Sequence, residues 1–190
     1  MPEPPAADAG RRPTPRETWA ALAREVGEPE AARRCVAMLT ADSPGDVADT
    51  LRRLGDPAPQ ALLPDSPWKR YWVRSWGARG LLYVWDESCA PSVVQGLADE
   101  HWRVAEMCVK VCARREIGTG GPGIAALAGH DLPRVRSAVA RALGLIGDTE
   151  HEAVLRRLRD DPDLSVQAAA ETALARMAER LDLPANDAIG

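Results

Sequence analysis

Cys108 and Cys112 are the residues of this sequence whose type and spacing best suit a metal ion. Side chains four residues apart share one face of a helix, and His101 could join them there. A zinc site needs four ligands, however, and no second cluster of Cys and His accompanies this one. The same spacing fits two small thiols on the buried face of a helix. We therefore expect buried cysteines and no metal.

The stretch GTGGPG at 118–123 shares only its glycines with a phosphate-binding loop. It lacks the Lys-Ser/Thr pair that such a loop requires and follows no expected strand, so we expect a long turn. The histidines His101, His130 and His151 all fall in or beside turns. No set of residues supplies the acid, base and oxyanion groups of an active site. The sequence therefore predicts a non-catalytic protein without a cofactor.

Aromatic residues gather in SPWKRYWVRSWGARGLLYVW, residues 66–85, which holds four of the six tryptophans. Such a cluster could form a binding platform, line a catalytic pocket or fill a core. The choice depends on the elements that carry the tryptophans, and on the direction in which those elements point them.

Composition favours helices for those elements. Ala, Leu and Arg are abundant, Phe is absent and β-branched residues are sparse, which predicts an all-α fold. The net charge of −4 argues against a general nucleic-acid coat. No apolar run of about 18 residues predicts a membrane span, and the start MPEPPAADAGRRPTP lacks the apolar stretch of a secretion signal. The four cysteines show no secreted disulfide spacing, so we expect a reduced, cytoplasmic protein.

A repeat organises the helices. Val73, Val104, Val135 and Val166 lie 31 residues apart, and each opens a similar segment. Counting each valine as position 0, apolar or small residues recur at positions 3, 4, 7 and 8, which share one face of an α-helix. A second apolar segment follows in the first three copies: PSVVQGLAD, PGIAALAGHD and EHEAVLRRLRD. Each unit is therefore expected to be helix, turn, helix, turn, and such units bury their apolar faces only by stacking.

The segments DLPRVRSAVARALGLIGD and DDPDLSVQAAAETALA resemble HEAT-like repeats, in which an acidic turn precedes Val-Arg or Val-Gln and an Ala-Leu helix. The resemblance covers roughly residues 64–180. It is weaker in DEHWRVAEMCVKVC, where Ala105 replaces the usual Arg. It implies a right-handed α-solenoid of about four units, a fold that generally serves as an interaction scaffold.

The N-terminal part does not share the 31-residue period. Residues 18–26, 30–39 and 44–54 are expected to form three shorter helices, the last of them capped by Ser43 and Asp46. The expected domain plan is a disordered leader (1–15), a helical cap or degenerate repeat (16–63), the repeat array (64–181) and a flexible tail (182–190).

The repeat register gives the tryptophans different expected roles. Trp76 stands at position 3 and is expected in the core, where Gly77 and Gly80 leave space for its indole. Trp85, near the end of its helix, is expected to pack as well. Trp102 lies in the turn between two units and could pack or face solvent.

Trp72 stands at position −1, where the later copies carry Arg103, Arg134 and Ser165. It is therefore expected at the surface, with Trp68 one turn before it, unless the N-terminal helices cover it. An exposed Trp beside Arg is typical of interface hot spots.

Positive charge recurs in the same register. At about 100° per residue, positions −1 and 6 point in nearly one direction, away from the apolar face. Stacked helices would align these residues into one band, although a solvated polar face would show the same pattern. Residues 66–160 hold 14 Lys or Arg against 11 Asp or Glu. The band, named the basic stripe, consists of Trp72, Arg79, Arg103, Lys110, Arg134 and Arg141.

The sequence thus predicts a monomeric HEAT-like scaffold that presents the basic stripe to an acidic segment of another protein. Nucleic acid is a less expected partner. Alkylpurine DNA glycosylases of similar architecture use Trp and Asp residues in a basic groove, with which Trp68, Trp72 and Asp86 are compatible. Bilin lyases and related chaperone-like HEAT proteins are a second alternative and offer no local motif to compare. The concave second helices are another candidate binding face.

Overall fold

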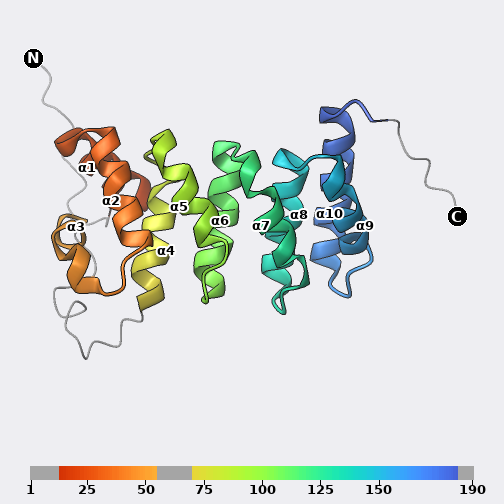
Figure 1. Ribbon diagram of the computed structural model, residues 1–190, viewed down its shortest axis with the longest axis horizontal. Helices are drawn as coiled ribbons and strands as arrows, with labels where there is room; N and C mark the ends of the chain where they lie inside the picture. Colours follow the sequence, from red (N-terminus) through yellow and green to blue (C-terminus); the bar gives the residue numbers. More distant parts are fainter. Residues whose placement is uncertain (1–12, 55–69, 184–190) are drawn as a thin grey trace, which may run out of the picture.

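The computed structural model describes residues 13–54 and 70–183. Within these two ranges the chain is helical and contains no β-strand. Figure 1 shows the helices as one elongated stack that runs in chain order from α1 to α10. The predicted all-α solenoid is confirmed. No helix in the described ranges is long and apolar enough to span a bilayer.

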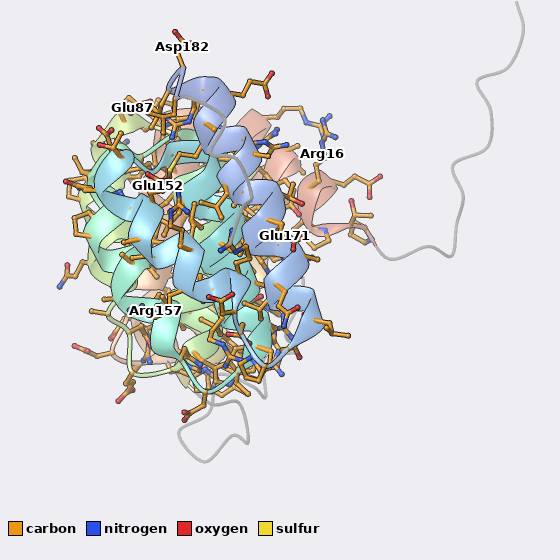
Figure 2. All side chains as sticks on the ribbon, turned by 90° about the vertical axis from the view of Figure 1, so that its right-hand side faces the viewer. Arg16, Glu87, Glu152, Arg157, Glu171 and Asp182 are labelled. Atoms are coloured by element: carbon orange, nitrogen blue, oxygen red, sulfur yellow. The ribbon has the colours of Figure 1, made fainter. Side chains whose placement is uncertain are left out.

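The repeats form two layers of helices. The first helices pack each against the next, and each second helix also packs against the first helix of the following repeat. Figure 2 looks along the stack from its C-terminal end and shows Glu152 and Arg157 of α9 on one side and Glu171 of α10 on the other. The first helices are α4 (Arg70–Gly80), α6 (Trp102–Arg115), α8 (Pro133–Ile146) and α10 (Leu164–Arg180), and the second helices are α5 (Ala90–Gly96), α7 (Gly121–Ala126) and α9 (Glu152–Arg159).

Short 3₁₀ turns connect the two layers. Three of them lead directly into second helices, and the fourth follows α7. In chain order they are η3 (Glu87–Cys89), η4 (Gly118–Gly120), η5 (Leu127–Gly129) and η6 (Thr149–His151).

The 31-residue period corresponds to burial. The four valines at position 0 are at most 4% exposed, and positions 4 and 7 are buried in all four copies. Positions −1, 6 and 10 are exposed or half exposed in every copy. The helices α6 and α8 each have a neighbouring first helix on both sides and second helices behind them, so this narrow strip holds their exposed residues.

The N-terminal helices are α1 (Pro15–Val26), α2 (Glu28–Leu39) and α3 (Ala48–Arg53), with the 3₁₀ turn η1 (Pro44–Val47) before α3. The first begins at Pro15, earlier than expected, because Thr14 and Glu17 form a capping box: the Glu17 carboxylate accepts a bond from the Thr14 N–H at 2.7 Å. Asp46 accepts from the Ser43 N–H at 2.9 Å, as predicted. Most of the predicted leader (1–12), the start of the predicted array (64–69) and most of the tail (184–190) lie outside the described residues.

Glycines in α4 bring α2 very close, and this corrects the expected role of Trp76. An added Cβ at Gly77 would lie 2.5 Å from the carbonyl oxygen of Cys35, and one at Gly80 would lie 2.6 Å from the Trp19 ring. The space beside the glycines is therefore filled by α2 and by α1. Trp76 is half-buried and packs against the core from its edge. Its position 3 lies only about 40° from position −1 around the helix, so a large side chain there reaches the surface strip.

Two largely buried ion pairs, one in the repeat of α4 and one in that of α8, join the first helix to the turn that ends the same repeat. Arg74 Nε donates to Asp99 at 2.7 Å, and Arg136 Nε donates to Asp161 at 2.6 Å. In both pairs a second guanidinium nitrogen donates to the other carboxylate oxygen, at 3.1 and 2.8 Å. These bidentate pairs span 25 residues each. The repeat between them has Ala105 where the other two have Arg, and His130 where they have Asp. Both members of the ion pair are therefore missing from this repeat.

The missing pair gives a first prediction. We expect Ala105→Arg and His130→Asp each to lower the free energy of unfolding, since either alone buries a charge without its partner. Combined, the two substitutions should form the missing pair and compensate part of each other's loss. In a double-mutant cycle the coupling energy between the two substitutions should be about 1–2 kcal/mol in favour of the pair. Urea unfolding of the wild type, both single variants and the double variant measures it. Strictly additive losses would show that this repeat cannot form the pair.

Candidate functional site

The six residues of the basic stripe lie on the first-helix layer, on α4, α6 and α8. Arg79, Lys110 and Arg141, all at position 6, are exposed. At position −1, Arg134 is exposed and Trp72 and Arg103 are half-buried. Seven residues separate the two positions, which places them about 10 Å apart along each helix. Because the three helices pack side by side in order, the register aligns both rows across the layer.

Together with Trp102 at position −2, the row at position −1 forms an alternating series of indole and guanidinium groups. The Arg103 guanidinium lies 5.3 Å from the Trp72 ring centroid and 4.6 Å from that of Trp102. Arg134 lies 4.9 Å from the same Trp102 centroid. These distances are typical of cation–π interactions, and such interactions stabilise a cation most where water is excluded. We call Trp72, Arg103, Trp102 and Arg134 the Trp–Arg ladder.

His101 fixes the backbone beneath the ladder. It is the N-cap of α6, and its Nδ1 accepts from the Arg103 N–H at 3.3 Å. Its own N–H donates to Asp99 at 2.8 Å. The imidazole stacks on the Tyr71 ring with centroids 3.4 Å apart. The sequence placed His101 in or beside a turn and offered it as a third metal ligand, whereas in the structure it caps α6 and connects the Arg74–Asp99 ion pair to the first residues of that helix.

Glu106 was not predicted as part of the site, yet it binds two of its cations. Its side chain is only 7% exposed and lies beside α8. Arg134 Nη2 donates to both of its oxygens, at 3.1 and 3.0 Å, and Lys110 Nζ donates to one of them at 2.8 Å. Glu106 occupies position 2, where the other copies carry Ser75 and Ser137. The sequence signal that could have identified Glu106 was the polar residue at position 2 in three of the four copies.

The remaining cations of the basic stripe have no internal counter-charge. Within residues 13–54 and 70–183, no ion pair involves Arg79, Arg103 or Arg141. Positions −1 and 6 of α4, α6 and α8 carry no acidic residue. The surface therefore combines two cations that share one carboxylate with three that form no ion pair within the described ranges.

The other tryptophans divide as follows. Trp85 is half-buried and packs against the core, as expected, and its Nε1 donates to Glu87 at 2.8 Å. Trp102 is the first residue of α6 and half-buried, and it belongs to the ladder. Trp68 lies outside the described residues. Trp72 lies near the start of α4 and Asp86 lies beyond its end, so the structure does not bring these two together as a glycosylase-like pair would require.

The cysteines are buried thiols, as predicted from their positions. Cys108 and Cys112 are 0% exposed. Burial raises the pKa of Cys108 far above its usual value and that of Cys112 to about 12, so both stay protonated at neutral pH and are poor ligands and nucleophiles. In the part of the chain that the structure describes, no three His, Cys, Asp or Glu side chains lie close enough together to hold a metal ion.

The glycine-rich stretch 118–123 is more ordered than the expected long turn. The 3₁₀ turn η4 leads directly into α7. An added Cβ at Gly120 would lie 2.9 Å from Cys112 Sγ, and one at Gly121 would lie 2.8 Å from the His151 ring. Gly120 and Gly121 therefore serve close packing of this segment on its neighbours.

Comparison with known families agrees with this architecture. Residues 90–175 match the family model described as HEAT repeats, a range that begins with α5 and ends within α10. A search of curated proteins finds no match to the chain. HEAT repeats commonly mediate protein–protein interaction, and proteins built from them are typically non-catalytic. With its stacked helix pairs and its matching repeats, this chain is a HEAT-like repeat protein.

Proposed function

We propose that this protein is a non-catalytic scaffold whose basic stripe binds an acidic segment of another protein. The observation that carries the proposal is the alignment of five cations and Trp72 at positions −1 and 6 of three successive first helices, with no acid at those positions. Three of these cations have no counter-ion among the described residues, and the ladder places two indoles beside one of them, Arg103. Aromatic and Arg side chains together are the usual composition of interface hot spots.

Rigid presentation is the proposed mechanism. Neighbouring first helices pack about 10 Å apart, so the stripe extends about 20 Å from α4 to α8. An extended segment of about six residues covers that distance. Stacked helices hold the cations in place before binding, which limits the conformational entropy lost on association.

We expect the scaffold to act as a monomer. The last helix, α10, ends the stack with a largely polar outer face, and Figure 2 shows Glu171 on it. Its exposed residues include Glu171, Thr172 and Glu179. A polar face on the terminal repeat is what keeps a solenoid soluble at its open end.

Reversing two charges tests the proposal. Arg79→Glu/Arg141→Glu changes exposed residues that form no ion pair with the described chain, so the fold should persist. Random peptides displayed on phage and selected on the wild type should be enriched in Asp and Glu. Their affinity for the double variant should fall at least about tenfold, since two close charge pairs become repulsive.

The matched control is Arg157→Glu/Arg159→Glu, the same charge change on exposed residues of α9 in the other layer. This variant should bind the selected peptides within about twofold of the wild type. Peptides without excess acid, or equal losses in both double variants, would contradict the proposal. Tight, steeply salt-dependent binding of duplex DNA that is lost with the stripe would favour the nucleic-acid alternative instead.

A further inference from the structure

The repeat register exposes a difference between the two guanidiniums of the Trp–Arg ladder. In two of the repeats, the residue at position 2 faces position −1 of the next repeat, 28 residues later. Glu106 binds Arg134 there, and Ser137 Oγ lies 3.4 Å from Ser165 Oγ. By the same spacing Ser75 corresponds to Arg103. The ladder therefore holds one Arg with an internal carboxylate and one whose corresponding position carries a hydroxyl.

Arg103 is positioned by aromatic contacts instead. Its guanidinium contacts both Trp72 and Trp102, and its backbone N–H is bound by His101. It is half-buried, and it forms no ion pair with any residue in the described ranges. A partly desolvated cation that is fixed in place but lacks a counter-ion is favourable only if an anion reaches it or if the indoles compensate it.

We infer that Arg103 is the specificity-determining anchor of the basic stripe, and that it binds an Asp or Glu carboxylate of the acidic partner segment in the way that Arg134 binds Glu106. This inference rests on the proposed function and deepens it. The partner supplies the carboxylate that position 75 lacks. Other cations of the stripe then contribute long-range attraction, whereas Arg103 makes the directed contact.

The geometry requires a guanidinium at this site. The carbon of the Arg103 guanidinium lies over both indoles, and its N–H groups make no hydrogen bond to the residues that the structure describes, so they can donate two parallel bonds to one carboxylate. A lysine ammonium is a compact point charge and cannot do both. Arg103→Lys should therefore weaken binding almost as much as loss of the charge. Arg79, exposed and without an aromatic contact among the described residues, should tolerate the same substitution.

Ser75→Glu tests the inference most directly. It places a carboxylate at the position that Glu106 occupies in the next repeat, so Arg103 should gain an internal partner and lose the external one. The probe is a fluorescein-labelled peptide of twelve glutamates, followed by anisotropy at about 20 mM salt, where screening is weak. We expect the affinity of Ser75→Glu to fall about tenfold, as for loss of one charged hydrogen-bonded contact. The neutral control Ser75→Gln should stay within about twofold.

The paired lysine variants keep the test decisive if Ser75→Glu fails to fold, which circular dichroism and thermal melting would reveal. Arg103→Lys should bind the probe about tenfold more weakly than Arg79→Lys. Equal affinities of the two lysine variants, or of folded Ser75→Glu and Ser75→Gln, would overturn the anchor role. Equal affinities of the two lysine variants would mean that the Trp–Arg ladder only stabilises the fold and does not bind the partner.

The outcomes separate this inference from the proposed function. If Arg79→Glu/Arg141→Glu abolishes probe binding while Ser75→Glu and Arg103→Lys leave it unchanged, the proposal of an acidic partner is supported and the anchor role of Arg103 is contradicted. If the wild type binds neither the glutamate probe nor acidic selected peptides, both fall. A DNA dodecamer that binds more tightly than the probe, and that Ser75→Glu releases, would assign the anion to phosphate and overturn the carboxylate inference.

Discussion

Replacing Arg136 by methionine is expected to cost about 3 kcal/mol of unfolding free energy at neutral pH, because it leaves the Asp161 carboxylate buried without its partner. Both side chains are largely buried, at 13% and 6% exposed. Arg136 donates to both oxygens of Asp161 and also, through Nη1, to the carbonyl of His130 at 2.7 Å. One guanidinium thus joins the turn before α8 to the turn before α10. Methionine keeps most of the bulk and removes every one of these bonds.

The loss should depend on pH in a defined direction. The hydrogen bond from Arg136 lowers the pKa of Asp161 below its usual value. A carboxyl whose folded-state pKa is depressed contributes stability that is present above the unfolded-state pKa and disappears as the pH falls through the folded-state pKa. The difference between wild type and Arg136→Met should therefore be full at about pH 7 and shrink below about pH 4. Urea unfolding across this range measures it.

Arg141→Met is the control on the same helix, since Arg141 is exposed and forms no ion pair within the described residues. It should change the unfolding free energy by no more than about 0.5 kcal/mol and without pH dependence in acid. Equal losses in the two variants would mean that the ion pair adds nothing beyond removal of one positive charge. A loss for Arg136→Met that persists unchanged in acid would contradict the role of the Asp161 carboxylate.

The repeat architecture was predictable because a solenoid repeats its local contacts. One spacing, that of the four valines, was enough to assign burial at positions 4 and 7. Even the weak repeat was visible, since Ala105 stands where its neighbours have Arg74 and Arg136, and the structure shows the partner Asp missing there too. Contacts within one repeat therefore follow from its own sequence.

Contacts of the irregular N-terminal helices did not follow in this way. Trp76 was expected to fill the space beside Gly77, but α2 fills it. A helical register gives the direction of a side chain and not the identity of the element that arrives there. Because α2 does not share the 31-residue period, nothing in the repeat indicated where it would dock.

The candidate site was predictable in its cations and not in their pairing. Positions −1 and 6 placed Arg103, Lys110 and Arg134 on the surface layer, where the structure also has them. Glu106 changes their electrostatics, since its one carboxylate pairs with two of the three and offsets one of their positive charges. Its contact with Arg134 crosses from one repeat to the next, and a distance between repeats depends on how closely the helices stack. The spacing of residues within one helix gives no information about that distance between helices.

Substituting Gly77 by alanine is expected to destabilise the N-terminal end of the stack by about 2–3 kcal/mol. The added Cβ would lie 2.5 Å from both the Cys35 carbonyl oxygen and the Leu39 nitrogen, and 2.8 Å from the Met38 Cβ. Two of these atoms are backbone, so no side-chain rotation relieves the clash and α2 must move away from α4. Alanine is favoured over glycine within a helix by about 1 kcal/mol, which offsets only part of the overpacking. Urea unfolding measures the total, and hydrogen exchange locates it.

Gly118→Ala is the matched control, because an added Cβ there meets no atom within 4 Å. It should leave the unfolding free energy within about 0.5 kcal/mol of the wild type. In Gly77→Ala, amide exchange should accelerate in α1 and α2 first, since these helices lose their contact with α4, while α8 and α10 keep their protection. Uniform acceleration along the stack would show that the N-terminal helices and the repeats unfold as one unit. Unchanged exchange in α2 would mean that the helix pair absorbs the extra methyl, and that the close approach of α2 to α4 is not what holds this end of the stack.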